Sequence, residues 1–356
     1  MGLLTHRFTH KNLVIMPLSI QNFITQTNPL PLIDVRSEGE FTHGHITGAT
    51  NIPLFDNAER ALVGTCYKQN GKDAAVLLGL EIVGPKLASF IRKVKEIAPN
   101  NEVLVHCWRG GMRSGSFAWL LNTAGIKANV LVGGYKAYRQ FVQQSFETPL
   151  NLIVLGGSTG SGKTEVLQEL KQIGEQVIDL EGIAHHKGSV FGALGQLPQP
   201  STEQFENLLF EQWKHLDPNR RTWIEDESRR IGTVYLDQRI WEQLRKAPVM
   251  VLQVPRDKRV EFLVKNYGKF DFEQLERALT IIQKRLGGQH YLTAIEALKS
   301  GDLAMVADIS LNYYDKAYQH GLSLREASHT LVPVADTNHY ENAKALIKAL
   351  EERDEV

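Results

Sequence analysis

Cysteine is scarce in this sequence, and several other features are missing as well. The 356 residues include only two cysteines, too few for a disulfide framework, so the sequence predicts a protein of a reducing cytoplasm. An excess of charge of one sign is also missing, because 40 basic residues balance 40 acidic ones. This balance gives no global indication of a nucleic-acid partner. No uninterrupted apolar run comes near the roughly 20 residues of a membrane span, so we expect no membrane partner.

The N-terminal residues lack the apolar stretch and the cleavage pattern of a signal peptide. We interpret residues 1–15 as a leader that is disordered ahead of the first domain. The remaining length exceeds the usual size of one domain and favours two. An amphipathic pattern at 133–149 ends at a proline, so we place the first domain at 16–148 and the second at 149–356.

Each half contains a short apolar run that leads into a glycine-rich loop and then into a helical pattern. These runs lie at 103–106 and 151–155. Strands that alternate with helices are typical of α/β domains with parallel sheets. Beyond residue 256 the pattern is mostly helical, so we expect a helical C-terminal part. The further predicted strands lie at 31–37, 129–132, 176–180, 222–227 and 247–254.

The loop in "HCWRGGMRS" carries the first candidate site. Cys107 follows the apolar run directly, and the helical pattern begins at Ser114. Glycines allow successive backbone N–H groups to turn inward and form a concave anion site. The helix N-terminus beneath the loop favours the thiolate, so Cys107 is the candidate nucleophile, and Arg113 is expected to grip two oxygens of one anion. The residues predicted to bind this anion are Trp108, Arg109, Gly110, Gly111, Met112 and Arg113.

A plainer interpretation is that each cysteine is a small buried residue. For Cys107 this leaves the two glycines and two arginines of the loop without a purpose. Cys66 lacks comparable surroundings, and we interpret it as structural. The neighbouring Lys68 and Lys72 keep the alternative of an accessory thiol open.

The second candidate site is a Walker A pattern, "GGSTGSGKT", between the predicted strand at 151–155 and an amphipathic helix. Its backbone N–H groups are expected to cradle a diphosphate or triphosphate, Lys163 to neutralise that charge, and the Thr164 hydroxyl to reach Mg²⁺. The residues predicted to bind the diphosphate are Gly157, Ser158, Thr159, Gly160, Ser161, Gly162, Lys163 and Thr164.

Polar residues after two neighbouring strands are candidates for a supporting role at the Walker loop. Asp226 is our first choice for the carboxylate on the metal side, with a solvated acidic loop as the alternative. Arg229 and Arg230 could add charge at a phosphate or pair with the adjacent acids. Asp179 follows another strand, and the histidines nearby are expected to form loop hydrogen bonds rather than to bind a metal.

The sequence around Cys107 resembles two families that share this loop architecture. Cysteine, five residues and then arginine fits the cysteine-dependent phosphatases. However, "LIDVRSEGEFTHGHITGATNIPL" and "LVGGYKAY" resemble the opening and closing segments of rhodanese domains. The resemblance implies a rhodanese-like fold with a loop large enough for a tetrahedral anion. Within it, Asp34 and Arg36 are expected to form a buried structural pair.

A rhodanese-like domain ahead of a Walker A domain resembles the tRNA 2-selenouridine synthases. Further motifs support this resemblance: "VGTCYKQNGKDAA", "DLEGIAHHKGSVFG", "EDESRRIG" and "IQKRLGGQHY". The resemblance implies a cytoplasmic transferase that replaces the sulfur of wobble 2-thiouridine in tRNA with selenium. It implies geranylation from geranyl diphosphate, then selenation from selenophosphate, with an enzyme that supplies selenophosphate as a further partner.

Two other interpretations of the same residues remain open. An ATP-dependent sulfurtransferase or kinase-like enzyme would also use a Walker loop, because that loop binds any suitable polyphosphate. A cysteine-dependent phosphatase would use the Cys107 loop, although it normally needs an aspartate general acid, and the sequence assigns none.

Overall fold

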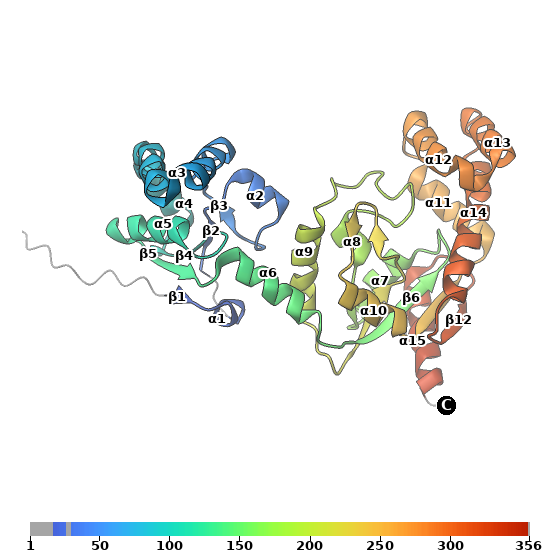
Figure 1. The fold of residues 1–356 in the computed structure, drawn as a ribbon. Helices are drawn as coiled ribbons and strands as arrows, with labels where there is room; N and C mark the ends of the chain where they lie inside the picture. The colour runs from blue at the N-terminus through green and yellow to red at the C-terminus, as the bar shows by residue number, and fades with distance from the viewer. Residues whose placement is uncertain (1–16, 26–29, 355–356) are drawn as a thin grey trace, which may run out of the picture. The chain divides into compact units, whose positions relative to one another are not determined.

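The computed structural model describes residues 17–25 and 30–354, so the leader expected at 1–15 lies outside the described residues. Contacts divide the chain into two compact units, residues 1–144 and 145–356. The sequence analysis placed this division at residue 148. Figure 1 shows a parallel sheet with helices around it in each unit.

The first unit is built on a five-stranded sheet with the strand order β1-β5-β4-β2-β3, in which every pairing is parallel. Its apolar residues form one core around β2 and β4. The elements of this unit are β1 (Pro17–Leu18), α1 (Ile20–Ile24), β2 (Leu32–Asp34), α2 (Glu38–His43), β3 (Thr50–Asn51), α3 (Asn57–Val83), the 3₁₀ turn η1 (Gly84–Lys86), α4 (Leu87–Ile97), β4 (Glu102–His106), α5 (Met112–Thr123), β5 (Lys127–Leu131) and α6 (Gly134–Ser145).

The register of the two central strands positions the cysteine loop. Asp34 at the end of β2 lies opposite His106 at the end of β4. Both strands run in the same direction, so the segments that follow them emerge at the same edge of the sheet. The loop that begins at Cys107 therefore leaves the sheet beside the segment that carries Arg36.

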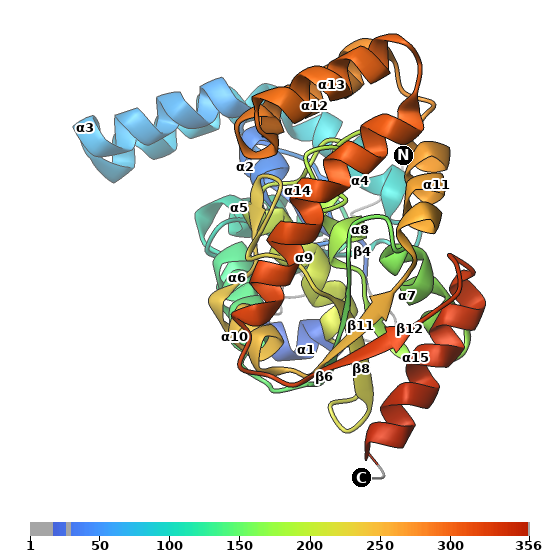
Figure 2. The ribbon, with the colours of Figure 1, turned by 90° about the vertical axis from the view of Figure 1, so that its right-hand side faces the viewer.

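The helix α3 was missed by the sequence analysis. It begins with a capping box in which Asp56 and Glu59 satisfy each other's backbone N–H groups, and it breaks at Gly71, where φ is 88°. Figure 2 shows it reaching away from the strands of its unit. Asn57–Ile97 is the one described segment long and apolar enough to cross a membrane, with 17% of the apolar window buried. A single segment of this kind is weak evidence for a membrane.

The second unit has a second five-stranded parallel sheet, with the strand order β12-β11-β6-β8-β7. Figure 2 shows β6, β8, β11 and β12 together with α15. The elements of this unit are β6 (Asn151–Gly157), α7 (Lys163–Gln172), β7 (Gln176–Ile178), α8 (Leu180–Ala184), α9 (Thr202–Trp213), β8 (Arg221–Glu225), β9 (Arg230–Ile231), β10 (Val234–Tyr235), α10 (Gln238–Lys246), β11 (Val249–Gln253), α11 (Arg256–Tyr267), α12 (Phe272–Leu286), α13 (Gly288–Lys299), α14 (Leu303–Ser323), β12 (His329–Pro333) and α15 (His339–Asp354).

The helices α11 to α14 gather at one end of the second unit (Figure 1). The helices α12 to α14 share an apolar core that is separate from the core of the sheet. The α/β class, the parallel sheets and the helical C-terminal part are confirmed. The predicted strands form, each within a few residues of its expected bounds, but the pairing of β12 with β11 was not predicted.

The buried His106 makes the stability of the first unit depend on pH. Burial lowers the pKa of His106 to about 4, although Asp34 lies 3.7 Å from its Nε2 atom and opposes the shift. The unfolded chain, with a histidine pKa of about 6.5, binds the proton first as the pH falls. The free energy of unfolding should therefore fall by about 2 kcal/mol between pH 7.5 and pH 5 from this group alone.

Urea denaturation of the full chain at these two pH values measures the effect. A His106→Phe variant should lose this part of the pH dependence, whereas a variant of the exposed His43 in α2 should retain it. Equal pH dependence in the wild-type and His106→Phe proteins would contradict this interpretation.

Candidate active site

The loop after β4 begins at Cys107, which packs in the apolar core of the first unit. The cysteine is 3% exposed, whereas Trp108 and Met112 on the loop are 36% and 57% exposed. Gly110 has a φ of 64°, and a Cβ atom there would lie 2.5 Å from the carbonyl oxygen of Leu131. Only glycine fits this position, which explains one glycine of the predicted anion site.

Two carbonyl groups of the loop have hydrogen-bond partners on the next helix, α6. The carbonyl oxygens of Cys107 and Trp108 accept hydrogen bonds of 2.9 Å from the N–H groups of Tyr135 and Lys136, at the start of α6. Interactions with the N–H groups of Arg109 and Ser114 lower the pKa of the Cys107 thiol. The hydrogen bonds to α6 fix the start of the loop, and the binding of an anion by its N–H groups stays a prediction.

The surroundings of Cys107 favour its thiolate. Burial raises the pKa of the thiol, but the Ser114 hydroxyl, the N–H groups of Ser114 and Arg109 and the charge of Arg113 together outweigh it, and the net pKa is lowered. The Ser114 Oγ atom lies 3.2 Å from the sulfur. A thiolate that is stabilised by hydrogen bonds is the reactive form of cysteine.

Arg113 is paired with Glu40 in this structure, and its grip on two oxygens of one anion stays a prediction. Its Nη1 atom donates to Glu40 at 2.8 Å, and the same carboxylate pairs with Arg60 at 2.9 Å. Burial raises the pKa of Glu40, but these partners outweigh burial and hold it below its ordinary value. Glu40 also closes the capping box of α2 with Ser37, and that box is the one signal in the sequence that could have located it.

A buried ion pair stabilises the loop that begins at Cys107. Arg36 donates to Asp34 at 2.6 Å and to the carbonyl oxygen of Gly44 at 2.6 Å, and both side chains are essentially fully buried. The guanidinium carbon of Arg36 lies 3.8 Å from the ring centroid of Tyr135. Tyr135 begins the helix that binds the loop carbonyls, so the pair fixes the loop rather than the reacting atoms. This position agrees with the structural role expected for it.

The Walker A residues form a loop between β6 and α7. Gly160 and Gly162 have φ values of 83° and 73°, and left-handed residues in such a loop let successive N–H groups point to a common centre. Lys163 begins α7, and its Nζ atom donates to the carbonyl oxygen of Gly157 at 3.0 Å. The loop therefore has the backbone and the cation that a diphosphate site requires.

Glu181, which the sequence analysis missed, is the carboxylate that meets the Walker threonine. The Thr164 hydroxyl donates to its Oε2 atom at 2.9 Å. A hydroxyl and a carboxylate, together with phosphate oxygens, form the kind of ligand set that Mg²⁺ takes, so these residues fit the ion. Among the described residues there is no group of three or more side chains that could hold a metal ion without a substrate.

Two further carboxylates stand close to Glu181. Glu225 is fully buried and accepts hydrogen bonds from the N–H groups of Leu180 and Glu181 at 2.6 and 3.1 Å. Burial and then the charge of Glu181 raise the pKa of both Glu225 and Glu227, and Lys163 opposes the shift at Glu227. Mutually repelling carboxylates of this kind would be stabilised by a bound cation.

The residues predicted to support the Walker loop are engaged elsewhere. Asp226 forms an ion pair with Arg325 instead of meeting Thr164. Asp179 caps α8 by accepting from the N–H group of Gly182 at 2.6 Å. Arg229 is exposed in the turn after β8. Arg230 donates to the carbonyl oxygen of Gly232 at 2.8 Å. Capping and pairing engage the side chains of Asp226, Asp179 and Arg230, whereas Arg229 is exposed. The supporting role of all four at the Walker loop stays a prediction.

A pair on two helices anchors the Walker loop and was not visible in the sequence. Arg259 of α11 donates to the carbonyl oxygen of Thr159 at 3.1 Å and forms two hydrogen bonds of 2.8 and 2.9 Å with Asp315 of α14. Arg259 is 7% exposed. The pair joins the loop to the helical end of the unit.

The two units define a class of protein in which a rhodanese-like domain precedes a P-loop domain. A family model described as the rhodanese-like domain matches residues 18–141. A model described as the tRNA 2-selenouridine synthase AAA domain matches residues 150–340. The chain belongs to the tRNA 2-selenouridine synthase family.

Two relatives show how much of the chain this similarity covers. A tRNA 2-selenouridine synthase of Sulfurovum sp. (strain NBC37-1) is 37% identical over 339 residues, which cover 85% of this chain and 92% of the relative. One of Bordetella petrii is 35% identical over 330 residues, which cover 82% and 86%. The similarity therefore extends over both units.

The hydroxyl of Ser114 should control how readily Cys107 ionises. Ser114→Ala removes a hydrogen bond to the thiolate, and hydrogen bonds to charged groups contribute about 1.5–3 kcal/mol. We expect the pKa of Cys107 to rise and its alkylation by iodoacetamide at pH 7 to slow by about tenfold. Peptide mapping by mass spectrometry separates Cys107 from Cys66.

Ser116→Ala is the matched control, because Ser116 lies on the same helix and is exposed. It should alkylate at the wild-type rate. Equal pH profiles for Ser114→Ala and wild-type protein would show that the hydroxyl does not stabilise the thiolate.

Proposed function

We propose that this protein is a transferase that replaces the sulfur of wobble 2-thiouridine in tRNA with selenium, through geranylation and then selenation. One observation carries the proposal: the chain combines a cysteine whose surroundings lower its pKa with a Walker A loop shaped by left-handed glycines. Membership of the tRNA 2-selenouridine synthase family supports the same substrate. A tRNA substrate also agrees with the cytoplasmic location expected from the scarcity of cysteine.

The Walker loop is the proposed site of geranylation. The diphosphate of geranyl diphosphate would lie on the loop from Gly157 to Thr164, with Lys163 against its charge. The sulfur of 2-thiouridine attacks the first carbon of the geranyl chain, a carbon–sulfur bond forms, and the carbon–oxygen bond breaks to release pyrophosphate. The base loses the proton of its ring nitrogen. Lys163 stabilises the charge that collects on the departing group.

Thr164 and Glu181 would hold Mg²⁺ in this site. When bound, the ion would neutralise charge on the diphosphate. The hydrogen bond between the two side chains keeps their oxygen atoms together before any substrate arrives.

The cysteine loop is the proposed site of selenation. Selenophosphate is a tetrahedral anion, and the amide hydrogens around Cys107 suit it. Attack of the thiolate on phosphorus breaks the phosphorus–selenium bond and releases selenide. The selenide adds to the base and displaces the geranyl thiol, which takes a proton, and water then releases phosphate from the cysteine. Alkylation in the first step makes the sulfur a better leaving group. Selenophosphate is reactive, so we expect a supplying enzyme as a partner.

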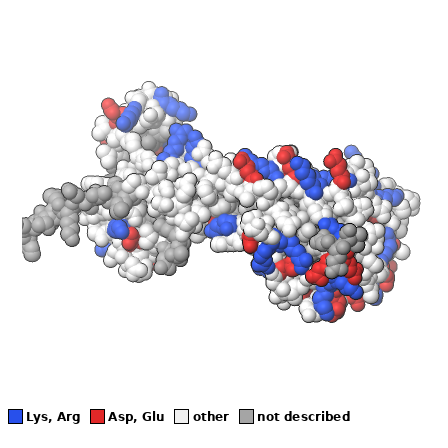
Figure 3. Space-filling model, turned by 90° about the horizontal axis from the view of Figure 1, so that it is seen from below, with Lys and Arg blue, Asp and Glu red and all other residues white. Residues whose placement is uncertain are grey.

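A groove beside the cysteine loop is a candidate binding site for a polyanionic substrate. It lies between α3 and the start of α5, and its lining includes Arg60, Lys68, Lys72 and Arg113 together with the aromatic Tyr67. Phosphate contacts of this kind weaken steeply as salt rises. The face of the molecule in Figure 3 carries basic side chains interspersed with acidic ones rather than a stripe of one sign. A local groove is thus the better candidate for binding tRNA.

Variants of the two loops should fail at different steps. Lys163→Ala should abolish geranylation of 2-thiouridine tRNA, because the charge on the leaving pyrophosphate is no longer neutralised. Cys107→Ala should geranylate the tRNA but deliver no selenium. Mass spectrometry of the wobble nucleoside after incubation with geranyl diphosphate and selenophosphate distinguishes the products.

The reverse pattern would exchange the two sites. A strict requirement for ATP in this reaction would favour an ATP-dependent sulfurtransferase or kinase-like enzyme. Release of phosphate from a generic aryl phosphate that depends on Cys107 would favour a phosphatase.

A further inference from the structure

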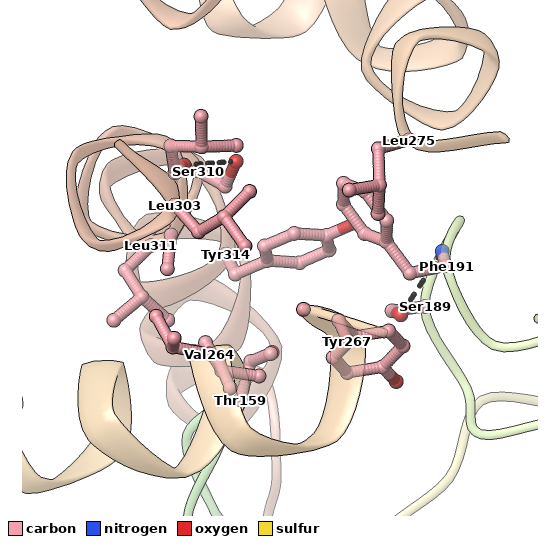
Figure 4. Close-up of a pocket in the computed structure, with 14 residues that line it drawn as sticks. Thr159, Ser189, Phe191, Val264, Tyr267, Leu275, Leu303, Ser310, Leu311 and Tyr314 are labelled. Atoms are coloured by element: carbon pink, nitrogen blue, oxygen red, sulfur yellow. Dashed lines mark hydrogen bonds between the residues drawn. The ribbon is translucent and has the colours of Figure 1, made fainter. Parts of the chain in front are cut away.

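The second unit contains an apolar pocket that the binding of phosphate does not explain. The space in it that is open to the centres of water-sized spheres is about 60 Å³, several times the roughly 10–15 Å³ that one water molecule needs. The helices α11 and α14 form most of its wall, and Leu275 of α12 and two residues of the loop after α8 complete it. The lining residues that Figure 4 labels are Thr159, Ser189, Phe191, Val264, Tyr267, Leu275, Leu303, Ser310, Leu311 and Tyr314.

This pocket adjoins the Walker A loop. Thr159 belongs to the loop and also lines the pocket. The hydrogen bond from Arg259 to the carbonyl oxygen of Thr159, and the pair of Arg259 with Asp315, fasten the loop to the two helices that form the wall. Figure 4 shows Thr159 at one end of the pocket and Leu275 at the other. A ligand that is anchored by phosphates on the loop would therefore have an apolar space beside it.

The chemistry of the lining disfavours a polar or charged ligand in this pocket. No charged side chain lines the pocket. The hydroxyl of Ser310 donates to the carbonyl oxygen of Val306 at 2.8 Å, and that of Ser189 accepts from the N–H group of Phe191 at 3.2 Å. Burial raises the pKa of Tyr267 to about 12, so its phenol is neutral. The buried hydroxyl of Tyr314 has no hydrogen-bond partner among the described residues, so one polar group of the lining is open to a ligand. A nucleobase would still leave most of its donors and acceptors without partners, whereas a hydrocarbon chain has none to leave.

We propose that this pocket receives the hydrocarbon chain of a prenyl diphosphate whose diphosphate lies on the Walker A loop. The inference rests on the proposed geranylation and adds the part of the fold that selects the donor. The reacting carbon would lie where the pocket meets Thr159, and the chain would extend towards Leu275. The pocket thereby distinguishes a prenyl diphosphate from a nucleotide, which the Walker loop alone does not.

Burial of the chain should dominate the affinity for the donor. Each buried methylene strengthens binding by about fourfold. Several such groups enter the pocket, so geranyl diphosphate should bind the full-length protein at least about 100-fold more tightly than inorganic pyrophosphate. Isothermal titration calorimetry in the presence of Mg²⁺ measures both affinities.

Filling the pocket should remove this difference. Ala307 of α14 lines the pocket, whereas Ala304, one turn earlier, is exposed and does not. Ala307→Phe should lower the affinity for geranyl diphosphate by at least about tenfold. It should leave the affinity for pyrophosphate unchanged, since the phosphate loop is intact. Ala304→Phe should behave as the wild-type protein does. If Ala307→Phe loses pyrophosphate binding, the smaller Ala307→Leu variant repeats the test.

The outcomes separate the pocket from the proposed function. Equal affinities of the Ala307 and Ala304 variants for geranyl diphosphate would overturn the pocket assignment even if the wild-type protein geranylates tRNA. Selective weakening at Ala307 would support the pocket even if no geranylated tRNA forms, in which case the proposed reaction fails. A wild-type protein that binds geranyl diphosphate no better than pyrophosphate would also overturn the assignment.

Discussion

Backbone N–H groups of a glycine-rich loop, placed where a parallel strand ends, are the donors on which both proposed anion sites depend. After β4 the carbonyl oxygens of Cys107 and Trp108 accept hydrogen bonds from the start of α6, and the N–H groups of Arg109 and Ser114 lower the pKa of the Cys107 thiol. After β6 the left-handed Gly160 and Gly162 shape the Walker loop. Such donors are fixed before a ligand arrives, so they stabilise negative charge without reorganisation.

Each of these loops also keeps its cations in contact with an acceptor until an anion arrives. Arg113 is paired with Glu40, and Lys163 donates to the carbonyl oxygen of Gly157. A tetrahedral or diphosphate anion would compete with these acceptors for the cation. The pairing satisfies buried or half-buried charges in the free protein, and it holds the cations close to the positions where substrates are expected.

Patterns that are local in the sequence predicted most of the fold and the centre of each site. The strand and glycine-rich loop around Cys107, and those around Lys163, are adjacent in the chain, so both could be recognised. Glu40 is 73 positions from Arg113, and no local pattern joins them. Asp226 is paired with Arg325, 99 positions away, and no local pattern joins these two residues either. The partners of a charged residue depend on tertiary contacts, whereas the residues of a loop do not.

Loss of selenouridine from cells that lack this protein tests the central claim most directly. Wobble nucleosides of tRNA would be measured by mass spectrometry in cells with and without the protein, all grown with selenium. The two loops predict 2-selenouridine where the protein is present and 2-thiouridine alone where it is absent. Equal 2-selenouridine in both cultures would contradict the proposed function.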